Sequence, residues 1–209
     1  MDQYRYPMGR QGRIIAESMN REHKPLTTWG LAHVTIEPCS VILDVGCGGG
    51  RTVGRLARRA PQGKVYGIDY SLDMVKYSRE LNRKLIAKNR AEIIEGSVEQ
   101  LSFSDGFFNM VTAIETYYFW SNFHAASTEI QRVLKPGGKL LMVNEMVADG
   151  KYEVENAKLI AETRVQLIPL EEIRLALKSI GFVDIQVSTK AGSPWNAVLA
   201  EKAANETLH

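Results

Sequence analysis

Short runs of apolar, mostly β-branched residues alternate along the chain with segments whose apolar residues recur at helical spacing. Such runs are typical of buried strands, and they occur at 41–45, 64–69, 91–95, 108–114 and 139–145. Two more strand-like runs, 182–187 and 196–202, are joined by a short connection, which predicts antiparallel neighbours. The alternation predicts an α/β fold with a seven-stranded, mostly parallel sheet, helices on both faces and an antiparallel last strand.

Segments of helical periodicity separate these strands and predict the helices that cover the sheet. They lie at about 51–58, 71–87, 122–134 and 169–180. Ser71 is the predicted N-cap of the second of these helices, and Gly181 ends the last one. Residues 147–168 break the alternation, so we expect an insertion or an irregular segment there.

The sequence predicts three parts of unequal size. Residues 1–39 precede the first strand and contain two amphipathic patterns, Arg10–Asn20 and Leu26–Val34, which predict a helical appendage. Residues 40–203 form the predicted core domain, and residues 204–209 a frayed tail. A chain of 209 residues suits one such domain with a substantial core.

A glycine-rich loop, Gly46-Cys47-Gly48-Gly49-Gly50, connects the first strand to the first core helix. Such a loop lets backbone N–H groups and a helix N-terminus approach a polar ligand closely. The dinucleotide pattern G-x-G-x-x-G would require a glycine at position 51, which is Arg51. Asp44 precedes the loop, where a carboxylate repels a pyrophosphate and attracts an ammonium group. The loop therefore favours a zwitterionic, cationic ligand.

The run from Leu43 to Gly50 resembles the first motif of class I S-adenosylmethionine (SAM)-dependent methyltransferases, most closely the small-molecule branch that includes the ubiquinone/menaquinone enzymes. Asp69 matches the acid that holds the ribose hydroxyls in this family, and Leu134–Gly138 matches the turn before its fifth strand. The resemblance covers about residues 40–146. It implies a Rossmann-like fold, SAM as methyl donor, S-adenosylhomocysteine (SAH) as product and a small-molecule acceptor.

The same resemblance implies which residues bind the cofactor. They are Asp44, Gly46, Cys47, Gly48, Gly50, Asp69, Tyr70, Ser97, Val98 and Ile114. Asp69 is expected at the ribose and Tyr70 on the adenine face. Many relatives carry an acid at the position of Ser97, whose hydroxyl can still accept a hydrogen bond. Cys47 also fits a small loop residue without a chemical role.

The segment after the fourth strand, Glu115 to Trp120, should lie at the edge of the sheet where methyl transfer takes place. Glu115 and His124 are titratable candidates for a general base, and His124 fits a helix surface equally well. Aromatic side chains suit both apolar acceptors and a sulfonium cation. Tyr117 is a candidate catalytic residue, and the candidate acceptor-pocket residues are Trp29, Tyr118, Trp120 and Trp195.

The family often uses an N-terminal segment as a lid, so the resemblance also makes Met19 and His23 possible pocket residues. The structural alternative is that residues 1–39 only pack on the core. Three other functions stay open: an RNA methyltransferase on the same fold, a nucleotide-dependent oxidoreductase, and a SAM-binding protein without activity. The sequence Glu115–Tyr118 lacks the Asn/Asp-Pro-Pro-aromatic pattern of base-amino methyltransferases.

Composition sets further bounds. A formal net charge of +2 gives no general electrostatic case for nucleic-acid binding, and the arginines of segment 51–59 fit a solvated helix face. The sequence has no run of about 18 apolar residues and no hydrophobic leader at Met1, so we expect a cytoplasmic protein without a membrane span. Cys39 and Cys47 are interpreted as reduced thiols, and no metal site is expected.

Overall fold

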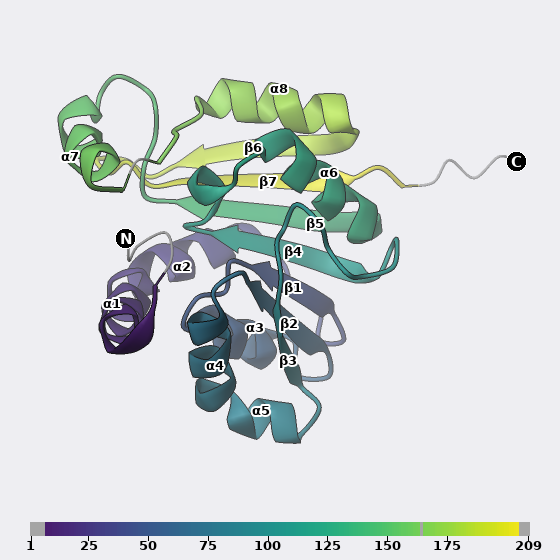
Figure 1. Ribbon diagram of the computed structural model, residues 1–209. Helices are drawn as coiled ribbons and strands as arrows, with labels where there is room; N and C mark the ends of the chain where they lie inside the picture. Colours follow the sequence, from purple (N-terminus) through teal and green to yellow (C-terminus); the bar gives the residue numbers. More distant parts are fainter. Residues whose placement is uncertain (1–6, 164, 205–209) are drawn as a thin grey trace, which may run out of the picture.

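The computed structural model describes residues 7–163 and 165–204. Its sheet has seven strands in the order β3-β2-β1-β4-β5-β7-β6 (Figure 1). Their bounds are β1 Val41–Val45, β2 Lys64–Asp69, β3 Ala91–Glu95, β4 Phe108–Ile114, β5 Leu134–Asn144, β6 Phe182–Thr189 and β7 Asn196–Lys202. Strands β1 to β5 pair in parallel, whereas β7 is antiparallel to both β5 and β6. The predicted fold class is confirmed.

The helices lie on both faces of this sheet. Their bounds are α1 Gly9–Glu22, α2 Lys24–Gly30, η1 Leu31–His33, α3 Arg51–Arg59, α4 Leu72–Leu81, α5 Arg83–Ala87, η2 Tyr117–Phe119, α6 Phe123–Val133, α7 Glu153–Thr163 and α8 Leu170–Ile180. Within the described residues, no helix is long and apolar enough to cross a membrane.

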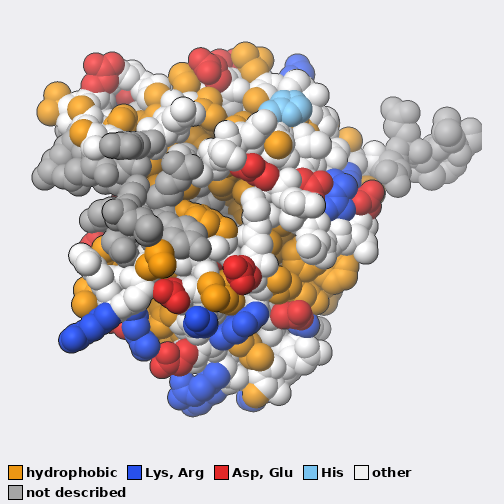
Figure 2. Space-filling view, viewed as in Figure 1, with side chains coloured by type: hydrophobic (Ala, Val, Ile, Leu, Met, Phe, Trp, Pro, Cys, Tyr) orange, Lys and Arg blue, Asp and Glu red, His pale blue; other side chains and the backbone are white. Residues whose placement is uncertain are grey.

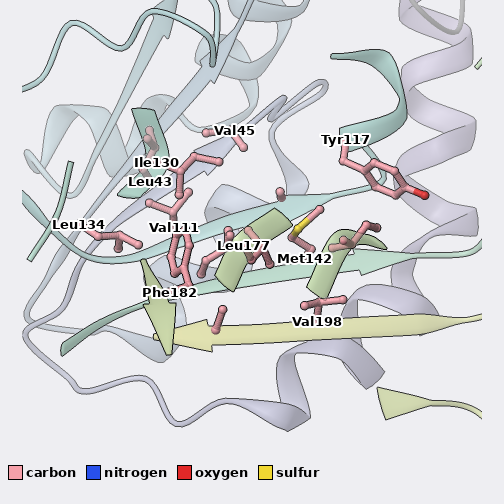
Figure 3. Close-up of a cluster of buried hydrophobic side chains, with 14 of the residues drawn as sticks. Leu43, Val45, Val111, Tyr117, Ile130, Leu134, Met142, Leu177, Phe182 and Val198 are labelled. Atoms are coloured by element: carbon pink, nitrogen blue, oxygen red, sulfur yellow. The ribbon is translucent and has the colours of Figure 1, made fainter. Parts of the chain in front are cut away.

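The sheet separates two hydrophobic clusters because alternate residues of each strand point to opposite faces. Leu43, Val111 and Met142 point to one face, where they meet residues of α6 and α8 (Figure 3). Ile42 and Leu141 point to the other face, where α2 and α3 cover them. Both clusters leave the carboxyl ends of the parallel strands open to a ligand, as expected for this class of sheet.

The N-terminal appendage has two parts that are held in different ways. Helix α2 is part of the core, because Leu26 and Gly30 are buried and α2 packs on β5. Helix α1 lies beside α4 (Figure 1) and is bound to it by a small apolar cluster of Ala16, Met74 and Tyr77 and by polar contacts. Gly9 N–H donates to Asp73 Oδ2 at 2.7 Å, and Arg13 Nη1 lies 3.1 Å from Glu80 Oε2.

Three local predictions need correction. The predicted helix 71–87 is two helices, α4 and α5, which are separated at Asn82. The side chain of Asn82 donates from Nδ2 to the carbonyls of Ser78 and Gly50. The segment 147–168, expected to be irregular, contains α7. Strand β5 begins at Leu134 rather than at position 139, because its first residues already pair with β4. Of the predicted tail, residues 205–209 lie outside the described part of the chain.

The contact between α2 and β5 gives a test of the packing. A Cβ built on Gly30 would lie 2.3 Å from Val143 Cγ2, which is far inside van der Waals contact. We therefore expect Gly30→Ala to destabilise the protein by about 1–3 kcal/mol, the usual cost of overpacking a core. Gly54→Ala is the matched control, because its Cβ would meet nothing closer than 3.4 Å and alanine favours a helix. Denaturant unfolding of both variants measures the difference, and equal stabilities would contradict the packing argument.

Candidate active site

A cavity of about 450 Å³ lies at the carboxyl ends of β1, β2 and β4 and is closed on one side by α1. The strand ends contribute Asp44, Asp69 and Ile114, and α1 contributes Met19 and Asn20. Because the strands are parallel, their ends meet at one edge, and residues far apart in the sequence line a single space.

The glycine loop forms one wall of the cavity. Gly46, Gly48 and Gly50 have φ angles of 65°, 47° and 76°, a left-handed conformation that glycine adopts without a steric penalty. A Cβ on Gly48 would meet no atom within 4 Å, so this position faces open space in the cavity. A Cβ on Gly50 would lie 2.1 Å from Ser78 Oγ, so this glycine is required by packing. Gly48 thus serves the ligand and Gly50 serves the fold.

Asp69 links the loop to the end of β2. Its Oδ2 accepts a hydrogen bond from Gly48 N–H at 2.8 Å, and its Oδ1 accepts one from Ser71 N–H at 2.9 Å. Burial raises the pKa of Asp69, and these two hydrogen bonds oppose the rise. Each carboxylate oxygen keeps a further lone pair, so the group can still accept hydrogen bonds from two ligand hydroxyls.

Asp44 is the most buried acid of the cavity, with 2% of its surface exposed. Its Oδ1 accepts a hydrogen bond from Thr112 Oγ1 at 2.6 Å, but its buried Oδ2 has no hydrogen-bond partner among the described residues. Burial raises the pKa of Asp44 to about 7, and the charge of Asp69 adds to the rise. A buried carboxylate oxygen without a donor costs free energy, which a cationic ligand group would recover.

Glu115 follows β4 in a left-handed conformation, with φ of 60°, which is uncommon for a residue other than glycine. The turn lets its Oε1 accept from Glu145 N–H and its Oε2 accept from Tyr118 Oη–H, both at 2.5 Å. Burial, together with the nearby charge of Glu145, raises the pKa of Glu115 to about 8. A buried side chain with a pKa near working pH is suited to proton transfer.

His23, between α1 and α2, faces the same carboxylates. Its Nε2 lies 3.6 Å from Glu145 Oε1 and 4.0 Å from Glu115 Oε2. Burial lowers the pKa of His23, but contact with Glu145 and the charges of both glutamates outweigh burial and raise it. The contact with His23 in turn lowers the pKa of Glu145. His23 and Glu145 therefore form an ion pair beside Glu115, whose raised pKa lets a bound cation shift it to the carboxylate form.

The aromatic residues after β4 divide between the cavity and the core. Phe119 and Trp120 line the cavity, and Trp120 Nε1 donates to Thr116 Oγ1 at 3.0 Å. Tyr117 and Tyr118 are buried in the hydrophobic cluster on the α6 and α8 face, where Figure 3 shows Tyr117. The 3₁₀ turn η2 explains the division, because it rotates successive side chains by about 120°.

Most of the predicted cofactor residues line the cavity. They are Asp44, Gly46, Cys47, Gly48, Asp69, Tyr70, Ser97, Val98 and Ile114. The neighbouring Glu99 accepts from Ser121 N–H and Asn122 N–H just before α6, so its carboxylate is held by the backbone there.

Other predicted site residues lie away from the cavity. His124 is exposed on α6, and Gly50 faces a different cavity. Trp29 and Trp195 contact each other on the α2 face of the sheet, with ring centroids 6.2 Å apart. The prediction that these tryptophans line the acceptor pocket is not supported by their position, because α2 packs them on the sheet rather than over its edge.

Reasoning from the sequence missed Glu145. The position of Glu145 in the sequence could have indicated it. Glu145 directly follows β5, just as Asp69 lies at the end of β2, and side chains at the strand ends of a parallel sheet converge. His23 was considered only as a lid residue. Its proximity to Glu115 depends on how α1 and α2 fold back on the sheet, and the sequence contains no local signal for that path.

A second cavity, of about 780 Å³, has the opposite charge. It lies among α1, α3, α4 and α5, and its cationic residues are Arg21, Lys24, Arg51, Arg55, Arg58, Arg83 and Lys84. Figure 2 shows the face of the molecule that is seen in Figure 1. Lys and Arg side chains lie over its lower part, where α1, α4 and α5 lie in Figure 1. Cationic side chains therefore gather beside the helices, whereas acids gather at the carboxyl edge of the sheet.

Comparison with known proteins agrees with this architecture. A family model described as a methyltransferase domain matches residues 43–142. The uncharacterized methyltransferase YdaC of Bacillus subtilis is 26% identical over 90% of this chain and 96% of that protein. A fatty-acid O-methyltransferase of Mycolicibacterium smegmatis is 30% identical over 61% of this chain and 44% of that enzyme. Geranyl diphosphate C-methyltransferase from Streptomyces coelicolor shares the fold, with a TM-score of 0.77, 14% identity and coverage of 88% and 77%.

The domain match over residues 43–142, the methyltransferase relatives, the sheet order and the cavity support a class I SAM-dependent methyltransferase. The resemblance of the glycine loop and of Asp69 to this class is thereby confirmed. The chain spans nearly all of YdaC but less than half of the fatty-acid O-methyltransferase. The shared part is the domain around the methyl donor, and the acceptor has to be inferred from the cavity of this chain.

The buried Asp44 predicts a conflict between stability and binding. Its pKa rises from an ordinary 3.8 to about 7 on folding, so the native state holds a proton more tightly than the unfolded chain and loses stability between pH 4 and pH 7. We expect Asp44→Asn to be more stable than the parent at pH 8 by at most about 4 kcal/mol, and equally stable near pH 4. Its affinity for SAM should fall. Unfolding at both pH values tests the stability, and calorimetric titration with SAM tests the affinity. An unchanged pH dependence of stability in Asp44→Asn would contradict the raised pKa of Asp44.

Proposed function

We propose that this methyltransferase transfers the methyl group of SAM to a small molecule bound in the cavity beside Glu115. The observation that carries the proposal is the convergence of Asp44, Gly48 and Asp69 on one side of the cavity, with Glu115 and Trp120 also among its lining residues. One set of residues suits the methyl donor, and the other set suits an acceptor.

The residues present fit SAM. The unpartnered Asp44 Oδ2 is placed to accept from the ammonium group, and the open space above Gly48 admits the methionine part close to the backbone. Asp69 offers its remaining lone pairs to the ribose hydroxyls. Tyr70, Ser97 and Val98 line the same cavity and are proposed at the adenine.

SAM supplies a sulfonium-bound methyl group that a nucleophile displaces in line. The protein's contribution is to align the acceptor, to exclude water and to remove a proton where the acceptor carries one. Phe119 and Trp120 provide an apolar wall, and Glu115 is the proposed base. The buried Tyr118 acts on Glu115 rather than on the acceptor, because its hydroxyl donates to Glu115 Oε2.

Relatives support a small acceptor. Similar proteins include a fatty-acid O-methyltransferase, malonyl-[acyl-carrier protein] O-methyltransferases and a sterol 24-C-methyltransferase. A cavity of about 450 Å³ lies within the usual range for small-molecule sites. The relatives' acceptors differ in chemistry, so they do not indicate the reacting group.

The methyl-donor assignment makes a direct prediction. The protein should bind SAM and SAH but not NADH, because Asp44 at the loop repels a pyrophosphate. Asp69→Ala should weaken SAM binding by roughly 1.5–3 kcal/mol, the range for hydrogen bonds to a charged group. Glu95→Ala is the matched control, since Glu95 is the register partner of Asp69 on β3 and does not line the cavity. Calorimetric titration decides the matter, and tight NADH binding without SAM binding would overturn the assignment.

We also propose that α1 is the lid of the site. It contributes Ala16, Met19 and Asn20 to the cavity. Among the described residues, its buried apolar contact with α4 is limited to Ala16 against Met74 and Tyr77, and polar contacts complete the boundary. Tyr77 Oη–H donates to Glu17 at 3.2 Å across the same boundary. Exposed contacts of this kind contribute little each, so α1 can open at low cost.

Two truncations separate the lid from the structural helix. Removal of residues 1–22 should leave a folded core with weaker SAM binding and lower turnover. Removal of residues 1–33 should prevent stable folding, because it also takes away the buried Leu26 and Leu31. Circular dichroism and turnover measurements test both truncations. Full turnover in the shorter truncation would show that α1 has no role as a lid.

A further inference from the structure

The acceptor side of the cavity carries an unusual combination of charge and apolar surface. Glu115 is 9% exposed and faces Glu145 and His23, and the cavity wall beside it contains Phe119 and Trp120. Among the described residues that line the cavity, Arg55 is the one Lys or Arg side chain, and it acts electrostatically on Asp44 rather than on Glu115. The acceptor end therefore holds two carboxylates against one imidazole.

We infer that the methyl acceptor is an amine that enters the cavity as its ammonium ion, is held by Glu115 between the carboxylates and the aromatic wall, and gives up its proton there before methyl transfer. This inference rests on the proposed function and names the chemical class of its substrate.

Charge decides between the candidate classes of acceptor. A carboxylate acceptor would bring a third negative charge into a buried site beside Glu115 and Glu145, where repulsion is screened less than in water. A neutral hydroxyl would leave the two acids with His23 as their one cationic partner. An ammonium ion favours the carboxylate form of Glu115, and the two carboxylates then face two cations.

The aromatic residues favour the same class. Trp120 stacks on Phe123 with ring centroids 5.8 Å apart, and its Nε1 is bound to Thr116, so the indole is fixed in place. An aromatic face attracts a desolvated cation through the negative charge of its π-system. An apolar acceptor of any class would profit from this wall, so the wall supports the inference only together with Glu115.

Protonation of the site is consistent with this chemistry. The groups that face Glu115 are His23 from the α1–α2 junction, Glu145 after β5 and Tyr118 from η2. Burial and Glu145 raise the pKa of Glu115 to about 8, while His23 opposes the rise. A base with this pKa is within a few units of an alkylammonium ion, so it can take the proton without holding it irreversibly.

The reaction balances with these groups alone. The ammonium gives one proton to the Glu115 carboxylate, and the nitrogen lone pair that becomes free forms the new N–C bond. The methyl–sulfur bond breaks with its electron pair left on sulfur, so the products are a methylated ammonium ion and SAH. The proton on Glu115 leaves through Glu145 and His23, which is partly exposed to solvent.

The chemical form of the product tests the inference without knowledge of the acceptor. The full-length protein is incubated with methyl-labelled SAM and a low-molecular-weight metabolite extract. Labelled product that is separated from residual SAM, and is absent without the extract, should be retained on a cation exchanger at neutral pH and should survive mild alkali, as an N-methylamine does. Label that alkali releases as methanol indicates a carboxyl ester and overturns the inference, as does label in stable, uncharged ethers or C-methyl products.

Variants connect this chemistry to the named residues. Glu115→Gln keeps the shape but cannot take a proton, so turnover should fall by ~100-fold, with partial recovery at higher pH where more of the amine is already neutral. SAM affinity should change less than twofold. Glu145→Gln should reduce turnover by a smaller factor, and Glu37→Gln, an exposed acid on the loop before β1, is the control without effect. Turnover of Glu115→Gln within twofold of the parent overturns the role of Glu115.

Binding gives a readout that does not depend on turnover. Benzylammonium should bind to the SAH complex, should bind at least tenfold more weakly to Glu115→Gln, and should bind far more tightly than benzoate. Preferential binding of benzoate overturns the inference. Titration with Mg²⁺, Mn²⁺ and Zn²⁺ is run in parallel, because ligand atoms of His23, Glu115 and Glu145 lie within 4.8 Å of one another. Tight binding of one of these ions that is lost in Glu115→Gln would show that the cluster is a metal site, and would overturn the inference of an amine acceptor.

The two levels of the proposal fail in different ways. If the protein does not bind SAM, the proposed function fails and no labelled product of any class forms. If SAM binds and label appears in esters, ethers or carbon-methylated products, the methyltransferase activity is supported and the inference of an amine acceptor is wrong.

Discussion

The hydrogen bond from Gly48 N–H to Asp69 Oδ2 is the contact on which the rest of the site depends. It connects the loop after β1 to the end of β2, and a second bond, from Cys47 N–H to the carbonyl of Ile68, runs beside it. Both fix the loop in the left-handed turns that only glycine adopts easily. Asn82 supports the loop from behind through the Gly50 carbonyl, so the break between α4 and α5 serves the site.

The regular part of the fold could be predicted from the sequence because its signals are local. Strands β1, β2, β3, β4 and β7 have the expected bounds, since buried strands read as short apolar runs. The break at Asn82 and the helix α7 could not be predicted in the same way. The side chain of Asn82 donates to the carbonyl of Gly50, which is 32 residues away in the sequence. Helix α7 follows a turn at Gly150, and such a turn resembles the start of a loop.

The cofactor residues were also easier to predict than the acceptor residues, for a physical reason. Asp44 and Asp69 occupy strand ends next to a glycine loop, and the geometry of the parallel sheet places them. Tyr117 and Tyr118 follow β4 by a single 3₁₀ turn, in which a change of one residue moves a side chain from the cavity to the core. The sequence shows that aromatics cluster there, but the turn decides that Trp120 lines the cavity and that Tyr118 supports Glu115.

Four acids converge on one sheet edge, and this convergence opposes stability in the absence of ligands. Burial raises the pKa of Asp44, Asp69 and Glu115, which means that folding disfavours their charged forms. The left-handed turn at Glu115 adds backbone strain. Such costs persist at functional sites, and bound cations would relieve the electrostatic ones: a sulfonium donor with its ammonium group at one end and the proposed amine at the other. The same electrostatic argument thus accounts for both halves of the cavity.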